Sequence, residues 1–387
     1  MNIIAVDWGK DVRKRSAYRA ELSTRRISRL PFDGSLLSLV EYAATLEPPV
    51  LIGIDAAIGF PEVSWQGLKK TNGCQSGNFI DFLLNSCLPV GFFDPVTQPE
   101  DWSPERPFIR PPPGSWSLMA FIEASNGGLY RQIDLRLNGN PIFVTSNLPG
   151  SVGSGTRALW QELIAVGKTS KFRVWPFHGS LDALSNAGTP VIAEIYPKAC
   201  YGIALAETLP APLLSLAKTQ PGTRQGALAQ LQHSEWVASS QIELHDLNAA
   251  LSNEDGFDAL LSAAALLRMV VENFPLEGPA DACATVEGSV LGAASLTNSA
   301  IRINSPQAKP SARAATRSTR TPTVYPCPIP GCYHMFHNTR SGWDAHVASI
   351  SRHPEWHPNV LEATERKQLL RREFPDWFQD GTCTRTT

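Results

Sequence analysis

The run Val50-Leu-Ile-Gly-Ile54 constrains the fold more than any other segment of this 387-residue chain. It is apolar throughout, and Pro48-Pro49 separates it from residues 35–46, whose apolar positions have helical spacing. A strand that is apolar at consecutive positions is buried on both faces, which is typical of a central strand in a sheet covered by helices. The chain is therefore predicted to contain an α/β domain.

Further strand and helix signals surround this run. Residues Asn2–Asp7, Arg15–Leu22 and Arg26–Phe32 favour a strand meander, Val191–Tyr196 a further strand, and residues 155–167, 224–237 and 255–274 favour helices. Apolar residues lie on most faces of the helix 255–274, so it is predicted to be buried. Proline-rich stretches break residues 62–170 into short pieces, which predicts a helical or irregular insertion.

The chain is expected to divide at residues 304–322, which are rich in Pro, Ser, Thr and Arg and contain no large apolar residue. This composition predicts a disordered basic linker after a large domain, residues 1–303. Residues 302–387 hold 12 Lys and Arg against 7 Asp and Glu, so they carry a net charge of +5, against −7 for residues 1–301. A basic tail favours a polyanionic partner, so nucleic acid is the predicted partner.

The sequence lacks the usual membrane and export signals. No apolar run approaches the roughly 20 residues that span a bilayer, and the N-terminus lacks the basic start and apolar stretch of a secretory signal. Five of the seven cysteines are scattered without a disulfide framework, which is typical of a reducing compartment. We therefore expect an intracellular protein with no membrane partner, cytoplasmic or, in a eukaryote, nuclear.

Acidic residues stand at the ends of the predicted apolar elements: Asp7, Asp55 and Glu194 on strands, and Asp255 and Asp258 at the start of the helix 255–274. The three-residue spacing of the last two places them on one helix face. Unpaired carboxylates are costly in an apolar core, so a group of them needs a compensating charge, and Mg²⁺ or Mn²⁺ is the usual one. Such a metal can hold a phosphodiester and activate water.

Some of these positions also have simple structural explanations. Asp255 can cap the helix, and Asp7 and Asp55 can support turns before Gly9 and Gly59. Glu194 is harder to explain in this way, because a glutamate within an apolar strand needs a partner. The four positions together indicate a site more strongly than any one alone.

Five motifs, in this order, resemble a known family: Val6-Asp7-Trp8-Gly9, Ile52-Gly-Ile-Asp55-Ala-Ala-Ile-Gly-Phe-Pro61, Glu194-Ile-Tyr-Pro197, Lys218 with Gly222-Thr-Arg224, and Asp255-Gly-Phe-Asp258-Ala-Leu-Leu-Ser-Ala263. Residues 1–300 thereby resemble the predicted nucleases with a ribonuclease H-like fold known as domain of unknown function 429. The resemblance implies a mixed five-stranded sheet with flanking helices. It also implies a site for Mg²⁺ or Mn²⁺ at Asp7, Asp55 and Asp258, with Glu194 and Asp255 as additional catalytic candidates.

Two basic residues of the fourth motif are candidates for contact with substrate phosphate. Arg224 follows a Gly-Thr turn at the start of the predicted helix, where an arginine is otherwise simply exposed, and Lys218 precedes it. A strand that ends in Asp-x-Gly also occurs in actin-like and sugar-kinase ATPases. No second glycine-rich phosphate loop and no duplicated half follow here, so the sequence favours a nuclease.

Cys327, Cys332, His346 and His353 resemble the ligands of a C2H2 zinc finger, in which a β-hairpin and a helix hold one Zn²⁺. The two later gaps, thirteen and six residues, are each about one longer than usual, so His357 is an alternative fourth ligand. Residues 323–360 are too short to fold by apolar burial alone, so zinc is expected to supply their stability.

The predicted finger and the basic helix and tail, residues 361–387, suit two kinds of partner. The positions that usually read bases are Thr339, Gly342 and Ala345, which cannot make bidentate contacts with bases. The finger is therefore expected to add non-specific affinity for nucleic acid or to dock a protein. The whole chain is predicted to be a metal-dependent nuclease, and the alternative is a non-catalytic interaction protein with the same scaffold.

Overall fold

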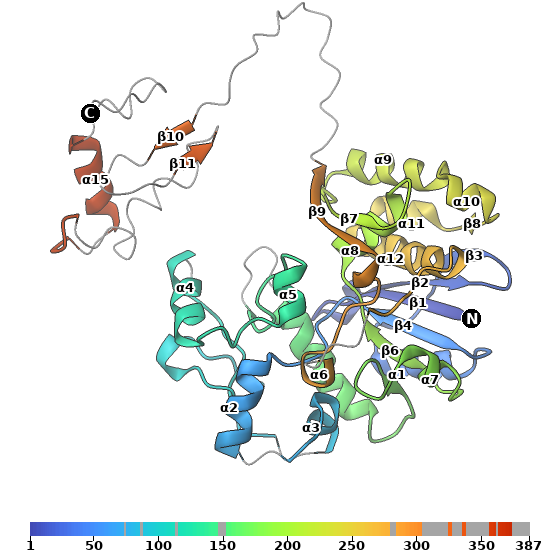
Figure 1. Cartoon of the computed structure of the whole chain (residues 1–387), viewed down its shortest axis with the longest axis horizontal. Coiled ribbons are helices and arrows are strands. Elements are labelled where there is room, and N and C mark those ends of the chain that lie inside the picture. The colour runs from blue at the N-terminus through green and yellow to red at the C-terminus, as the bar shows by residue number, and fades with distance from the viewer. Residues whose placement is uncertain are drawn as a thin grey trace, which may run out of the picture. The chain divides into compact units, whose positions relative to one another are not determined.

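A computed structural model of the chain describes residues 1–72, 75–85, 88–112, 115–145, 152–278, 284–303, 324–326, 335–337, 356–360 and 363–373. The chain divides into two compact units, Met1–Gln307 and Ala308–Thr387 (Figure 1). This division falls within the segment predicted to be a linker, residues 304–322, which lies outside the described residues.

The larger unit is built on a mixed seven-stranded sheet with the order β5-β6-β4-β1-β2-β3-β8. Its strands are β1 (Asn2–Asp7), β2 (Ser16–Glu21), β3 (Arg26–Arg29), β4 (Val50–Ile54), β5 (Arg173–Val174), β6 (Val191–Glu194) and β8 (Glu243–Leu244). Strand β2 is antiparallel to β1 and β3, whereas β1, β4, β6 and β5 are parallel neighbours. The α/β class is confirmed. The expected five strands are too few, because β5 and β8 are two-residue edge strands that leave no pattern in the sequence.

Helices cover both faces of the sheet (Figure 1). They are chiefly α1 (Leu36–Ala44) and α6 (Gly153–Val166) on one face, and α8 (Pro197–Leu205) and α12 (Glu254–Val271) on the other. Within β1, Ile4 and Val6 join the first core, and Ile3 and Ala5 join the second. Both faces of this strand are buried, which is why its sequence is apolar without interruption.

The insertion after β4 is a helical layer held together by aromatic rings. Its helices are α2 (Glu62–Asn72), α3 (Phe79–Asn85), α4 (Ser115–Ala124), α5 (Gln132–Arg136) and α6. Buried rings of Phe60, Phe79 and Trp160 pack at its centre, with 4.6 Å between the ring centroids of Phe79 and Trp160. This aromatic core is continuous with the sheet face beneath α1 and α6, so the insertion is part of the domain.

Two glycines allow the start of the insertion to approach a segment from near the end of the domain. Gly59 and Gly288 have φ values of 141° and 74°, and a Cβ at either position would overlap a backbone carbonyl of the other segment. The backbone N–H of Phe60 donates to the carbonyl of Val286 at 2.9 Å. The two segments therefore meet backbone to backbone, which only glycine allows at these positions.

The remaining elements complete both units. They are α7 (Leu181–Ser185), α9 (Pro221–Gln232), α10 (Glu235–Ser239), α11 (Leu247–Ser252), α13 (Ala284–Glu287), the 3₁₀ turns Val12–Lys14, Pro99–Asp101 and Ala293–Ser295, the parallel pair β7 (Ala211–Leu216) and β9 (Leu296–Ile303), and, in the second unit, β10 (Val324–Pro326), β11 (Met335–His337) and α15 (Ala363–Glu373). The single helix expected over residues 224–237 is wrong: the chain leaves α9 at His233 and begins α10 after Ser234. None of the helices in the described ranges has the length and apolar character needed to cross a membrane.

Candidate active site

Carboxylates that the sequence singled out meet at one edge of the sheet. Because β1 and β4 are parallel neighbours, Asp7 at the end of β1 and Asp55 directly after β4 lie at the same edge. The backbone N–H of Asp55 donates to the carbonyl of Val6 at 3.0 Å, which ties the two segments together. Helix α12 packs against β1 and contributes Asp258 from its first turns.

The pKa values of these groups show that their charges repel one another. Burial and the charges of Asp258 and Asp55 raise the pKa of Asp7 well above its usual range. Burial and the charge of Asp258 raise the pKa of Asp55 to about 7. Burial also raises the pKa of Asp258. The acidic site, defined as Asp7, Asp55 and Asp258, thus holds more negative charge than the protein around it compensates.

A lysine and a tyrosine hold the innermost carboxylate. Asp258 is 1% exposed; its Oδ1 accepts a hydrogen bond from the hydroxyl of Tyr201, and its Oδ2 pairs with the ammonium of Lys218. The side chain of Lys218 is 34% exposed, so it reaches Asp258 from the solvent side. Burial lowers the pKa of Lys218, but the carboxylates of Asp258, Asp7 and Asp55 outweigh burial and raise it. Lys218 is therefore charged at neutral pH.

The other two residues predicted near substrate and metal have structural contacts. Arg224, a candidate phosphate ligand, is 5% exposed; its Nε donates to the carbonyl of Leu251 at 2.8 Å and its Nη1 to that of Lys218 at 2.5 Å. Asp255 is not the cap of α12, because Asn253 accepts the backbone N–H of Asp255 at 2.6 Å. Burial raises the pKa of Asp255, which lies half-buried in the first turn of α12.

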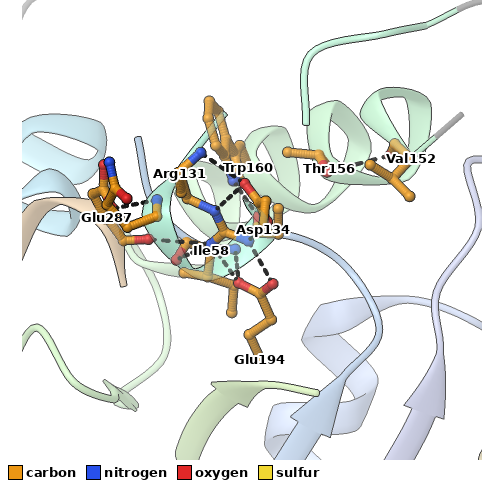
Figure 2. A network of polar contacts seen from close by, with 10 residues as sticks. Ile58, Arg131, Asp134, Val152, Thr156, Trp160, Glu194 and Glu287 are labelled. Atoms are coloured by element: carbon orange, nitrogen blue, oxygen red, sulfur yellow. Dashed lines mark hydrogen bonds and ion pairs between the residues drawn. The ribbon is translucent and has the colours of Figure 1, made fainter. Parts of the chain in front are cut away.

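Glu194 is paired with an arginine that no sequence motif indicated. Arg131 precedes α5 and is 1% exposed; its Nη1 and Nη2 donate to the two carboxylate oxygens of Glu194, each at 2.7 Å (Figure 2). The backbone N–H of Ile58 donates to the same carboxylate at 2.7 Å. The partner that this strand-interior glutamate requires thus comes from the insertion, 63 residues earlier in the chain.

The remaining N–H groups of Arg131 are also satisfied. Nε and Nη2 donate to Asp134 at 3.1 and 2.8 Å, and Nη1 lies 3.2 and 3.1 Å from the carbonyls of Ile58 and Glu287 (Figure 2). A guanidinium has five N–H groups, and all of them face acceptors here. Arg131 therefore connects β6, the insertion and the segment around α13.

A cavity of about 440 Å³ lies beside the acidic site. Its walls include the segments that follow three parallel strands, Trp8–Lys10, Asp55–Ala57 and Glu194–Tyr196, together with residues around α5 and the start of α6. Ligands of α/β proteins commonly bind outside the carboxyl ends of parallel strands. This cavity is therefore the candidate substrate site.

The chemistry of the acidic site suits a hard divalent cation, because its donors are carboxylate oxygens with excess negative charge. Among the described residues, no three or more His, Cys, Asp or Glu side chains are arranged to hold a metal ion. Both oxygens of Asp258 face Tyr201 and Lys218 instead. Asp7 and Asp55 are the residues placed to bind a metal first, and Asp258 would join them once Lys218 withdraws.

The predicted zinc ligands Cys327, Cys332, His346 and His353 lie outside the described residues. Strands β10 and β11 pair antiparallel on either side of residues 327–334, the stretch that contains both cysteines. His357 is described, and its Nε2 lies 2.5 Å from the Oε1 of Glu373 in α15.

Comparison with known protein families, with characterised proteins and with solved structures found no match for this chain. The function must therefore be argued from the residues and contacts of the site.

Replacing the ammonium that faces the acidic site should make stability depend on metal. Lys218→Met leaves the carboxylates uncompensated, and we expect it to cost about 1–2 kcal/mol of unfolding free energy, a modest value because Lys218 is partly screened by solvent. Added Mn²⁺ should then raise the unfolding midpoint of this variant more than that of the wild type. Thermal unfolding with and without Mn²⁺ measures both, with the exposed Lys168→Met as the matched control. Equal Mn²⁺ responses in all three proteins would contradict a cation site here.

Proposed function

We propose that this chain is a divalent-metal-dependent nuclease that hydrolyses phosphodiester bonds of nucleic acid. The observation that carries the proposal is the convergence of Asp7, Asp55 and Asp258, from three separate elements, into one site beside a cavity. Mutual repulsion on this scale destabilises the fold, so its presence favours a function that a bound cation would complete.

The sheet supports a ribonuclease H-like domain. Its five central strands, β3-β2-β1-β4-β6, form a mixed sheet with helices on both faces, as the resemblance to domain of unknown function 429 implies. On this proposal β5 and β8 are additions at the two edges.

Each residue of the site has a role in this proposal. Asp7, Asp55 and Asp258 would hold Mg²⁺ or Mn²⁺, which when bound supplies Lewis-acid stabilisation and an activated water. Tyr201 orients Asp258 through its hydroxyl, and Lys218, charged and partly exposed, is placed to contact a substrate phosphate after it leaves Asp258. Other residues act by positioning: Arg224 holds the carbonyl of Lys218, and Arg131 holds Glu194.

The smaller unit is proposed to be a zinc finger followed by a basic helix. The antiparallel pair β10 and β11 supports this proposal, because such a finger begins with a hairpin whose connection carries the two cysteines. The contact between His357 and Glu373 favours His353 as the fourth ligand. Together with the net charge of +5, the finger would add affinity for nucleic acid or bind a protein partner.

One observation favours the alternative, a non-catalytic interaction protein. Lys218 already neutralises part of the acidic site, and in the described part of the chain no three-ligand metal group is assembled. On this alternative the acidic site is purely structural and the finger provides the only function.

A cleavage screen combined with metal analysis separates the two functions. The full chain is incubated with labelled single-stranded and duplex DNA and RNA, with Mn²⁺, with Mg²⁺ and with neither. The nuclease proposal expects metal-dependent cleavage and uptake of Mn²⁺ in addition to one tightly bound Zn²⁺. Uptake of Zn²⁺ alone, with no cleavage of any substrate, would support the interaction protein.

The finger makes its own prediction. We expect Cys327→Ser to reduce zinc from one equivalent to a trace and to make the smaller unit sensitive to protease, because metal binding supplies the folding free energy of such modules. Cys383→Ser is the matched control and should retain zinc. Elemental analysis and limited proteolysis of the full chain measure both effects. Full zinc content in Cys327→Ser would exclude this cysteine as a ligand, and comparison of His353→Ala with His357→Ala identifies the fourth.

A further inference from the structure

The indole of Trp8 carries a buried N–H group that has no acceptor. Trp8 is 4% exposed, and within the described residues its Nε1 has no hydrogen-bond partner. Buried N–H groups are almost always paired, because an unpaired one loses its hydration without compensation. An exception beside a candidate active site points to a ligand that supplies the acceptor.

The indole is also held in place. The guanidinium of Arg15 lies 3.6 Å from the centroid of a Trp8 ring. Arg15 is itself fixed, because it pairs with Glu162 at 2.8 Å and donates to the carbonyls of Gly9 and Gly34 at 2.8 and 2.5 Å. One face of the indole is therefore covered, and the N–H cannot find an acceptor by a small rotation of the ring.

Trp8 lines the cavity of about 440 Å³, whose other walls suit a planar and largely apolar group. Ile142, Val152, Ile195 and Tyr196 provide apolar and aromatic surface, and Asn140 and Ser154 provide polar groups. Cavities of about 300–1,000 Å³ with apolar walls and a few polar groups are typical of small-ligand sites.

The charges in the cavity argue against a phosphate there. The lining contains the carboxylates Asp55, Asp134 and Glu194, and Arg131 uses its whole guanidinium on the last two and on backbone carbonyls. Lys10 is the remaining charged residue of the lining. The cavity thus has no excess of positive charge, and a neutral ligand with hydrogen-bond acceptors fits it better than an anion.

We propose that this cavity receives one nucleobase of the substrate strand, with the Trp8 N–H donating to a ring nitrogen or carbonyl of that base. The identification of the ligand as part of a nucleic acid rests on the proposed function. A base has two apolar faces and acceptors on its edge, and enzymes that bind a single base unstack it into such a pocket. Asp55 belongs to both the cavity and the acidic site, so the bound base belongs to a nucleotide next to the cleaved phosphodiester. A strand with unpaired bases is therefore the preferred substrate.

Binding of two single strands to the full chain tests this inference without any cleavage. One is a short single-stranded oligonucleotide, and the other is an abasic strand of the same length and charge, both measured by fluorescence anisotropy without added Mg²⁺ or Mn²⁺. We expect the wild type to bind the intact strand about 10-fold more tightly, the size of one base-stacking contact. Trp8→Phe keeps an aromatic ring but removes the N–H, and should weaken binding of the intact strand about 3–10-fold with no change for the abasic strand.

Trp65→Phe is the matched control, because Trp65 also has a buried indole N–H without a partner in the described part of the chain but does not line the cavity. It should bind both strands as the wild type does. Equal affinity of the wild type for the two strands, no binding of the intact strand, or equal losses in both tryptophan variants would overturn the inference. Base-dependent binding without metal-dependent cleavage would leave the pocket standing and remove the nuclease. Cleavage without base-dependent binding would do the reverse.

Discussion

Asp55→Asn is expected to abolish Mn²⁺-dependent cleavage while the domain stays folded, and Asp7→Asn should do the same. Each substitution removes a negative charge that would bind the metal, and such charge stabilisation is worth several kcal/mol in a metal-assisted hydrolysis. We therefore expect rates at least about 10³-fold below the wild type. Initial rates of the purified variants measure the effect, and circular dichroism checks the fold. Cleavage at the wild-type rate by both folded variants would refute the assignment of the site.

The stability of Asp55→Asn separates a lost charge from a lost fold. The pKa of Asp55 is raised to about 7 in the folded protein, against about 3.9 for an unfolded aspartate, so the folded state binds this proton more tightly. That contribution to stability is complete below pH about 4 and is lost as the pH rises toward 7. The unfolding free energy of Asp55→Asn, measured without added metal, should therefore fall less over this range than that of the wild type.

Asp11 provides the opposite case as a control. Hydrogen bonds from Arg13 lower its pKa to about 2, so its contribution is present above pH about 4 and is lost as the pH falls toward 2. Asp11→Asn should leave the pH dependence between 4 and 7 as in the wild type. A change of slope in both variants would mean that the effect does not come from the acidic site.

The apolar pattern of the sequence was sufficient to predict the centre of the sheet. Strands β1 and β4 have the predicted bounds, because both are buried on two faces and every residue shows it. The rule that parallel strands end at one edge then placed Asp7 and Asp55 together. The edge strands β5 and β8 escaped prediction, because two residues with backbone pairing on one side carry no apolar period.

The partners of the buried carboxylates could not be predicted from local patterns. Tyr201 and Arg131 lie 57 and 63 residues from Asp258 and Glu194, so only the folded chain brings each pair together. The need for a partner was visible at Glu194, but its identity was not, since Arg131 belongs to an insertion whose shape depends on aromatic packing. Arg224 was predicted from a turn motif, which does not reveal that its side chain is buried.

Arg131→Met should destabilise the domain by about 3–5 kcal/mol, because it leaves the carboxylates of Glu194 and Asp134 buried without a cation. Arg13→Met is the matched control: Arg13 forms an ion pair with Asp11 at 2.9 Å, but its side chain is 85% exposed. An exposed pair contributes about 0–1 kcal/mol. Urea unfolding of the full chain measures both variants.

A second substitution tests whether the loss comes from the orphaned charge or from lost packing. Glu194→Gln in the Arg131→Met background removes one unpaired carboxylate but keeps an oxygen that can accept the N–H of Ile58. If charge burial dominates, the double variant should recover part of the stability, because its remaining side chains need less neutralisation. If the aromatic insertion is held only by the volume of Arg131, the double variant should be no more stable than Arg131→Met. Recovery would show that the ion network, rather than its bulk, docks the insertion beside Asp55 and so shapes the cavity.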